Sequence, residues 1–355
     1  MLAFATTNGT LTTHQRSIKS PDISVTEKDN NIKHHFKINS SEALDSERGM
    51  LLKVYSGLVL AADALLVLLR VLLAILEALV SKFLPAKEKP VAGEIALITG
   101  TGHGIGRELA HQLGALGATL VCWDVNQEWN EKTAAELRKK GYKVHAYRCD
   151  VSNREEVLNL AKKVQTEVGD VSIIINNAGI MPCRPFSTYT PEVIRRIFDV
   201  NVFAHFWILE AFLPRMISNN HGHVVGLSSM AGVMGITNLV PYCASKYAVR
   251  GMMEALSEEL RENLKNSQIH FTTIFPFIVD TGLCQKPRTR FPSLLAIVQI
   301  PKAASEIIKA MRRNYNEYSI PNGLLDLNHF LRLLPLKATN TIKDFVDSGV
   351  GAHDE

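Results

Sequence analysis

The chain has 355 residues, a hydrophobic content of 46% and a formal net charge of +4. This length allows one large α/β domain with extra segments or two small domains, and the hydrophobic fraction is ample for a packed core. The charge is small and no basic stripe is interleaved with aromatic residues, so we do not expect a nucleic-acid partner. Five scattered cysteines lack the spacing of metal ligands, which predicts free thiols and no metal site: Cys122, Cys149, Cys183, Cys243 and Cys284.

The first 49 residues are rich in Ser, Thr, Asn, Lys and His and show little hydrophobic periodicity. Segments of this composition cannot bury enough apolar surface to offset the entropy lost on ordering. We therefore expect residues 1–49 to form a disordered polar tail.

Residues 50–85 differ sharply from this tail. The run Leu58–Val80 is almost entirely Leu, Val and Ala and is long enough for a helix that spans a bilayer. Asp63, Arg70 and Glu77 interrupt the run at steps of seven, so the three charges line one narrow seam of a helix. A helix in the membrane interface, a tight hairpin and a packed oligomeric span each accommodate this seam. A buried core helix is the alternative without a membrane.

Membrane attachment of residues 50–85 is the interpretation we favour. Lys82, Lys87 and Lys89 follow the apolar run. Since positive residues tend to stay on the cytoplasmic side, we expect the following domain to face the cytosol.

From Ile95 onward, short apolar runs alternate with helical patterns. This alternation predicts a doubly wound parallel sheet with helices on both faces, a Rossmann-type α/β domain over residues 90–315. The predicted strands are Ile95–Thr99, Thr119–Trp123, Lys143–Arg148, Val171–Asn176, His223–Leu227 and Phe271–Phe275. The predicted helices are Arg107–Leu116, Glu128–Lys140, Arg154–Val168, Pro191–Ile217, Tyr242–Leu264 and Lys302–Arg313.

Residues 316–355 are a predicted C-terminal extension, rich in leucine from Ile320 onward. A second membrane-touching amphipathic patch, a substrate lid and a packed subdomain helix are equally compatible with this composition.

A glycine-rich turn, Thr99–Gly106, follows the first predicted strand and opens a helix. Glycines let the backbone turn sharply and approach a pyrophosphate at the helix N-terminus, where free N–H groups favour negative charge. The expected cofactor contacts of the turn are Gly100, Gly102, His103, Gly104, Ile105 and Gly106.

Asp124 ends the next predicted strand, where an acidic side chain meets the ribose hydroxyls of a dinucleotide. Its carboxylate would repel a 2′-phosphate, so we expect NAD(H) as the cofactor. His103, a possible weak cation in the turn, leaves NADP(H) open.

Later strand ends add further candidates for cofactor binding. Asp150 closes the third predicted strand, where it would meet the adenine amino group or serve as a helix N-terminal residue. After the sixth strand, backbone groups of Val279 could hold the carboxamide and Thr281 a phosphate. The fourth strand ends in small residues that let the chain pass close to the cofactor, and Asn176 there is expected to be structural. The contacts expected after it are Asn177, Ala178 and Gly179.

Tyr242 and Lys246 stand four residues apart, so they share one face of a predicted helix. The ammonium can favour the charged form of the phenol and lower its pKa, which is normally ~10. Such a phenol exchanges a proton with the oxygen of an alcohol or carbonyl. Tyr-x-x-x-Lys is common by chance, but Ser229 lies thirteen residues upstream and the glycine-rich turn precedes it.

These segments, in this order, resemble the short-chain dehydrogenase/reductase family over roughly residues 90–315. Four stretches are more narrowly similar to its membrane-anchored subgroup that acts on retinoids and 17β-hydroxysteroids, which includes epidermal retinol dehydrogenases and lipid-droplet 17β-hydroxysteroid dehydrogenases. They are Gly93–Arg107, Trp123–Asn126, Asn201–Trp207 and Asn220–His223.

The resemblance implies four catalytic positions. Ser229 would bind the substrate oxygen, and Ser228 would be its structural neighbour. Tyr242 would be the acid/base, and Lys246 would bind the nicotinamide ribose and tune Tyr242. Asn201 would hold a water that links the lysine to solvent. One departure is Phe277, where the family usually has glycine.

The resemblance implies an NAD-dependent oxidoreductase that acts on the hydroxyl or carbonyl of a lipophilic small molecule. It also implies attachment to the endoplasmic reticulum membrane or a lipid droplet, and a homodimer formed through the Pro191–Ile217 and Tyr242–Leu264 helices. Two alternatives stay open: an NADPH-dependent reductase of retinaldehyde or another lipid aldehyde, and a non-catalytic membrane or lipid-droplet scaffold that keeps the fold.

Overall fold

The computed structural model of the chain describes residues 27–291 and 296–352. The chain divides after Leu84 into two units. The first unit contains α1 (Glu27–Phe83), a single helix of 57 residues.

The expectation of a disordered tail is corrected for residues 27–49, which belong to α1. The stretch from Glu27 to Arg48 contains neither proline nor glycine, so nothing in it breaks a helix. The rest of the predicted tail, residues 1–26, lies outside the described residues.

Within α1, the stretch Arg48–Val80 is long and apolar enough to cross a membrane, judged by length and composition, and none of it is buried. A tight hairpin is wrong for this stretch, because the helix is uninterrupted.

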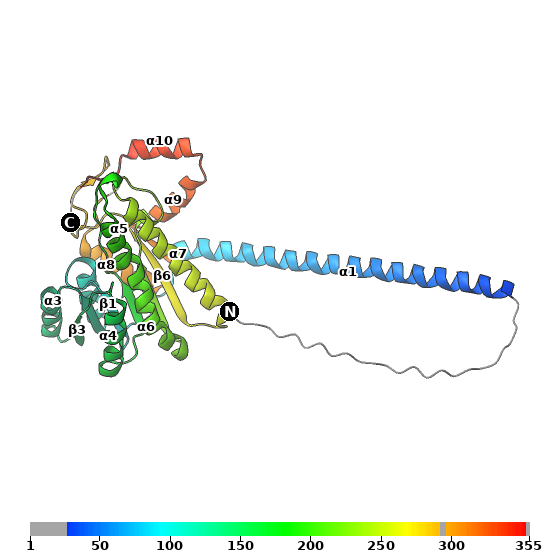
Figure 1. Cartoon of the computed structure of the whole chain (residues 1–355), viewed down its shortest axis with the longest axis horizontal. Helices are drawn as coiled ribbons and strands as arrows, with labels where there is room; N and C mark the ends of the chain where they lie inside the picture. The colour runs from blue at the N-terminus through cyan, green and yellow to red at the C-terminus, as the bar shows by residue number, and fades with distance from the viewer. Residues whose placement is uncertain (1–26, 292–295, 353–355) are drawn as a thin grey trace. The chain divides into compact units, whose positions relative to one another are not determined.

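The second unit is built on a seven-stranded parallel sheet of order β3-β2-β1-β4-β5-β6-β8 (Figure 1). The doubly wound α/β fold is thus confirmed. The strands are β1 (Ile95–Thr99), β2 (Thr119–Asp124), β3 (Val144–Arg148), β4 (Ile173–Asn176), β5 (Gly222–Leu227), β6 (Ile269–Pro276) and β8 (Glu317–Ile320).

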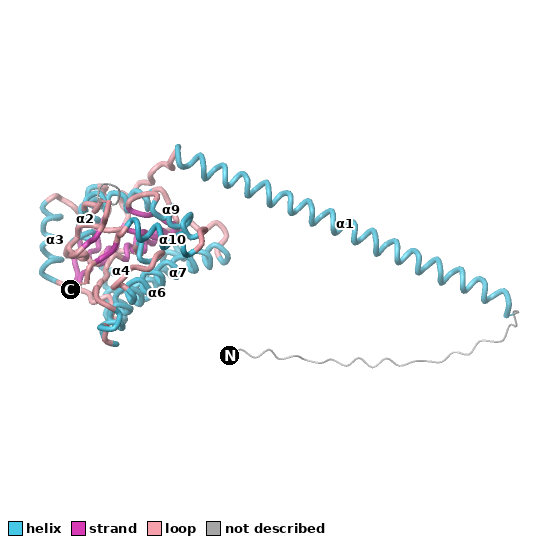
Figure 2. Tube along the Cα trace, turned by 90° about the horizontal axis from the view of Figure 1, so that it is seen from above, coloured by secondary structure: helices cyan, strands magenta, loops and turns pink. Residues whose placement is uncertain are grey.

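Helices cover both faces of this sheet (Figure 2). Side chains alternate along each strand, so Ile98 of β1 packs with α2 (Gly104–Ala115), α3 (Gln127–Lys139) and α8 (Ile300–Arg312) on one face. Leu97 packs on the other face with α4 (Arg154–Glu167), α6 (Ala204–Asn219) and α7 (Val240–Asn263).

The predicted helix Pro191–Ile217 is not continuous. It forms as α5 (Pro191–Phe198), a π-helical turn η2 (Asp199–Phe203) and α6. A π turn adds one residue to the helical repeat and often occurs at functional sites. This stretch is also apolar enough to cross a membrane, but more than half of it is buried in the unit's core.

The sheet extends beyond the predicted domain end at residue 315, because β8 adds a seventh strand next to β6. After β8 come α9 (Leu324–Arg332) and α10 (Leu336–Val346). The chain then returns as β9 (Gly349–Val350), which pairs antiparallel with β7 (Pro287–Arg288). The five cysteines are free.

Candidate active site

One large cavity, of about 890 Å3, lies at the carboxyl ends of the parallel strands. Most residues that the sequence singles out line it: Gly100, His103, Gly104, Ile105, Asp124, Asp150, Asn177, Ala178, Gly179, Ser229, Tyr242, Lys246, Val279 and Thr281. Three others do not line the cavity but lie against residues that do: Gly102, Gly106 and Asn201.

The glycine-rich turn between β1 and α2 has no room for a side chain at two positions. Gly100 has φ +74°, a left-handed conformation that favours glycine, and a Cβ there would lie 2.9 Å from Nδ2 of Asn177. A Cβ on Gly106 would lie 2.0 Å from the carbonyl oxygen of Gly100. The turn therefore folds tightly against the first turn of α2.

The N-terminus of α2 lies at the cavity wall and, in the described part of the chain, no side chain caps it. The first turn also contains no acidic residue. In contrast, Asn126 caps α3 and Asn153 caps α4. The N–H groups at the start of α2 and its dipole are thus available to an anionic group such as a pyrophosphate.

Asp124, at the end of β2, is buried beside the glycine-rich turn. Its Oδ2 accepts a hydrogen bond from the Gly102 amide at 2.8 Å, and its Oδ1 accepts one from the Asn126 amide at 2.8 Å. These bonds fix the carboxylate where the sequence predicts the contact with a ribose.

Asp150 after β3 and Asn177 after β4 line the cavity and also form hydrogen bonds that hold the local backbone. Oδ1 of Asp150 accepts hydrogen bonds from the amide and the hydroxyl of Ser152, so it organises the approach to α4 while still lining the cavity. Nδ2 of Asn177 donates to the carbonyl oxygen of Thr99 at 2.8 Å. Asn177, and not Asn176, therefore ties β4 to the end of β1.

The segment after β6 closes the far side of the glycine-rich turn. Val279 forms a parallel bridge with Val298. The methyl group of Thr281 lies 3.5 Å from the position that a Cβ on Gly104 would take. This segment therefore passes over the start of α2.

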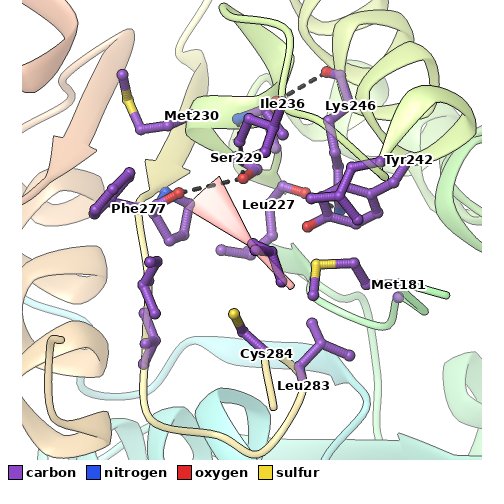
Figure 3. A pocket seen from close by; sticks show the side chains of 18 of the residues that line it. Met181, Leu227, Ser229, Met230, Ile236, Tyr242, Lys246, Phe277, Leu283 and Cys284 are labelled. Atoms are coloured by element: carbon purple, nitrogen blue, oxygen red, sulfur yellow. Dashed lines mark hydrogen bonds between the residues drawn. The ribbon is translucent and has the colours of Figure 1, made fainter. Parts of the chain in front are cut away.

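Tyr242 and Lys246 lie side by side on α7, and both are almost fully buried. The lysine Nζ lies 5.6 Å from the centre of the tyrosine ring and donates a hydrogen bond to the carbonyl oxygen of Leu227 at 2.8 Å (Figure 3). Burial lowers the pKa of Lys246 from 10.5 to about 8. The pair predicted from spacing is thus brought together at the cavity.

Ser229 follows β5 and faces the same cavity. Its hydroxyl donates to the carbonyl oxygen of Pro276 at a long 3.3 Å and accepts from the Ala231 amide at 3.1 Å. The hydroxyl of Ser228 instead donates to the carbonyl oxygen of Lys246 at 2.8 Å. Ser228 therefore holds α7, while the weakly bound Ser229 hydroxyl can turn to another acceptor.

Asn201 lies inside η2 and is fully buried. Its Oδ1 accepts from the Ile180 amide at 2.8 Å, while its Nδ2 donates to the Ile180 carbonyl oxygen at 2.9 Å and to the Ser245 hydroxyl at 3.1 Å. The side chain thus ties the segment after β4 to α7. A Cβ on Gly179 would lie 3.2 Å from Oδ1 of Asn201 and 3.6 Å from Nζ of Lys246, so both atoms lie next to this small residue.

Comparison with known proteins agrees with this geometry. The family model described as short chain dehydrogenase matches residues 94–290. The chain belongs to the short-chain dehydrogenase family. It is accordingly an oxidoreductase.

Among members of this family, the chain is 44% identical to epidermal retinol dehydrogenase 2 of Mus musculus, over 78% of this chain and 89% of that protein. It is 41% identical to 17-beta-hydroxysteroid dehydrogenase 13 of Homo sapiens, over 78% of this chain and 91% of that protein. A short chain dehydrogenase/reductase from Burkholderia phymatum, solved in complex with NAD, superposes with a TM-score of 0.62 at 25% identity. That match covers 68% of this chain and 93% of the solved chain.

Compared with the usual short-chain dehydrogenase pattern, this chain brings a bulky Phe277 to the cavity wall. The Phe277 amide donates to the carbonyl oxygen of Ile320 at 2.8 Å, which fixes the backbone at the end of β8. In Figure 3, the ring lies opposite Tyr242 and Met181 across the pocket, with Ser229 between them. Phe277 therefore forms part of the apolar wall that faces Tyr242 across the cavity.

The C-terminal extension contributes apolar side chains to the cavity lining, which the substrate-lid alternative allowed without naming the residues. Its side chains recur at helical spacing on α9 and α10, a signal that identifies an amphipathic helix but not its partner. The residues concerned are Leu324, Leu327, Leu331, Ile342 and Val346. The extension forms two helices, as the packed-helix alternative states. Both helices line the cavity, as the lid alternative requires.

Proposed function

We propose that this enzyme transfers a hydride between NAD(H) and the hydroxyl or carbonyl carbon of a lipophilic substrate, a retinoid or a 17β-hydroxysteroid. One observation carries the proposal: Tyr242, Lys246 and Ser229 line the same cavity as the uncapped N-terminus of α2. A proton-transfer group and an anion-binding turn in one space are the requirements of a dinucleotide-dependent dehydrogenase.

The residues of the turn fit NAD(H). The N–H groups at the start of α2 would hold the pyrophosphate, and the fixed carboxylate of Asp124 would accept hydrogen bonds from the adenosine ribose. Asp150 and Thr281 would contact the adenine end and a phosphate, and Val279 the carboxamide. When bound, the nicotinamide ring supplies the acceptor or donor of the hydride.

Tyr242 would carry the proton. In the oxidation of an alcohol, the phenolate oxygen would take the proton of the substrate hydroxyl, while the carbon that bears this hydroxyl would give its hydride to the nicotinamide. In the reduction of a carbonyl, the phenol would give the proton back to the substrate oxygen. The buried ammonium of Lys246 would favour the phenolate, and its remaining N–H groups would bind a ribose hydroxyl. The Ser229 hydroxyl would leave its long bond to Pro276 and hold the substrate oxygen.

Asn201 would support proton exchange from the back of the site. Its side chain is committed to Ile180 and Ser245, so we assign the water to the main-chain groups of the π turn. A π turn leaves backbone carbonyl groups outside the regular helical pattern. Such a water would connect Lys246 with solvent behind Gly179.

The apolar character of the outer cavity supports a lipophilic substrate. Met181, Met230, Phe277, Leu283 and Leu327 line it beyond the Ser229 hydroxyl. The printed names of the two relatives, a retinol dehydrogenase and a 17-beta-hydroxysteroid dehydrogenase, point to the same class.

We also propose that Arg48–Val80 anchors the enzyme in the endoplasmic reticulum membrane or at a lipid droplet, with the catalytic domain on the cytosolic side. The length and apolar composition of this stretch and the lysines after it support this assignment. A homodimer through α5–α6 and α7 belongs to the same proposal.

The decisive experiment uses purified full-length enzyme with retinol or estradiol and either NAD or NADP. We expect turnover with NAD. Preference for NADPH with retinaldehyde would support the alternative reductase. Absence of binding of either dinucleotide in calorimetry would contradict the enzymatic proposal and favour a scaffold.

A further inference from the structure

The junction of α9 and α10 exposes large apolar side chains. Leu333 is 82% exposed, Leu336 is 74% exposed and Phe330 is 60% exposed. Contiguous exposed apolar groups of this size are unusual on a soluble surface and indicate an interaction site. We call these three residues the apolar tip.

Other residues of the same two helices line the cavity. Leu324 and Leu331 of α9, and Ile342 and Val346 of α10, border the proposed substrate space. Leu327 belongs to both surfaces, because it lines the cavity and is 51% exposed. The cavity lining and the apolar tip thus belong to the same segment, α9 and α10 (Figure 1).

The orientation of this layer is fixed by polar contacts to the catalytic domain. The Arg332 guanidinium donates to the carbonyl oxygen of Val233 at 2.5 Å and to the Tyr247 hydroxyl at 2.6 Å. Thr339 of α10 donates to the carbonyl oxygen of Leu331 at 3.1 Å, which joins the two helices. The tip therefore projects from a defined place beside the cavity.

We propose that the apolar tip inserts into a phospholipid surface, so that the lipophilic substrate passes between lipid and cavity beside Leu327 without crossing water. This inference rests on the proposed function for the class of substrate. It adds a second lipid contact, made by the catalytic domain itself.

Three observations favour lipid over a protein partner. Side chains that are 74–82% exposed stand clear of their neighbours, so the tip protrudes, and a fluid lipid layer can close around a protrusion. Lys337 follows the tip directly and would meet anionic headgroups. The face is continuous with an apolar cavity, and the chain carries a separate stretch of membrane-spanning length.

Fluorescence quenching tests the contact directly. Full-length Leu333→Trp and the matched control Leu116→Trp are reconstituted in vesicles of phosphatidylcholine and phosphatidylserine, with or without brominated acyl chains. Leu116 is a partly exposed leucine that follows α2 and does not line the cavity. We expect the brominated lipid to remove the added fluorescence of Leu333→Trp and to leave that of Leu116→Trp. Equal quenching in the two variants, or none in Leu333→Trp, overturns the proposal.

Kinetics with a substrate dissolved in the vesicles provides the second measurement. The double variant Leu333→Ser/Leu336→Ser is compared with Leu116→Ser. Loss of two inserted leucines should lower kcat/KM for vesicle-dissolved retinol by about tenfold, with NAD affinity and Tm unchanged. An unchanged kcat/KM overturns the passage of substrate at the tip.

The outcomes separate the two proposals. If the wild type turns over neither retinol nor estradiol, the proposed function fails while quenching still reports the lipid contact. If a second copy of the chain covers the tip, Leu333→Trp escapes quenching and the double serine variant dissociates in light scattering, which overturns the lipid contact.

Discussion

The ammonium of Lys246 donates a hydrogen bond to the carbonyl oxygen of Leu227, with 2.8 Å between the two atoms. Leu227 is the last residue of β5, and Ser228 beside it donates to the carbonyl oxygen of Lys246. The strand end and α7 therefore hold each other at two points. This double contact keeps the lysine charge beside the ring of Tyr242.

If Tyr242 carries the proton, Tyr242→Phe should lower kcat/KM by about 10²–10⁴-fold, the usual contribution of general acid–base catalysis. The ring is buried and Phe keeps its shape, so NAD affinity and Tm should change little. Steady-state rates with retinol and calorimetric titration of NAD check both statements. Tyr315→Phe, a tyrosine that stacks on Tyr318 and does not line the cavity, is the control. Equal rates for Tyr242→Phe and Tyr315→Phe would show that another group moves the proton.

Asp124 should determine the preference between NADH and NADPH. Asp124→Asn removes the charge but retains an acceptor for the Gly102 amide, so the glycine-rich turn should stay folded. The loss of charge-assisted bonds to the ribose predicts about 10- to 100-fold weaker NADH binding. NADPH should bind more tightly, because the repulsion of its 2′-phosphate is removed.

Fluorescence titration of both dinucleotides measures these affinities. Asp124→Ala, which also removes the bond to Gly102, is the companion variant and should weaken both cofactors. A parallel change of NADH and NADPH affinity in Asp124→Asn would contradict the assignment to the ribose.

His205 should make the fold sensitive to acid. Burial, with a smaller contribution from the Lys246 charge, lowers the pKa of His205 from 6.5 to about 3. Between these values the unfolded chain binds a proton that the folded chain does not. The stability is therefore complete above pH 6.5 and falls as the pH drops towards 3, by about 1.4 kcal/mol per pH unit.

Denaturant unfolding at pH 7.5, 6 and 5 measures this slope. His205→Leu should lower the pH dependence of the unfolding free energy by about 1.4 kcal/mol per pH unit, because one proton fewer is bound on unfolding. Burial also lowers the pKa of His223 well below 6.5, so a pH dependence of the unfolding free energy due to His223 should remain in His205→Leu. An identical slope in His205→Leu and wild type would refute the role of His205.

The strands of this fold were predictable from sequence, because buried parallel strands are short apolar runs between turn residues. All six predicted strands form within two residues of their expected ends. The seventh, β8, has only Tyr318 and Ile320 as apolar residues, and its burial depends on elements far away in sequence. The π turn at Asp199–Phe203 was also not predictable, since these residues carry no signal that distinguishes it from an α-helix.

Much of the site followed from spacing, because i and i+4 on a helix must share a face. Spacing could place Tyr242 beside Lys246, but not the bond of the lysine to Leu227. Nor could it show that Asn177, instead of Asn176, holds β1, since both are amides at one strand end. The lining by α9 and α10 depends on packing between segments distant in sequence.

Gly106 and Gly251 are both helical glycines, but only Gly106 lies against the backbone of another segment. An alanine at Gly106 would put its Cβ 2.0 Å from the Gly100 carbonyl oxygen, and a backbone atom cannot move away as a flexible side chain does. Gly106→Ala should therefore lower the unfolding free energy by about 1–3 kcal/mol.

Gly251, on α7, has no heavy atom within 4 Å of its would-be Cβ. Gly251→Ala should raise the unfolding free energy by about 0.5–1 kcal/mol, because alanine loses less backbone entropy in a helix. Urea titrations of the two variants against wild type measure both effects. If Gly106→Ala keeps wild-type stability, the turn must open at little cost. The uncapped start of α2 would then not be held in place for a pyrophosphate, and the cofactor assignment would lose its structural basis.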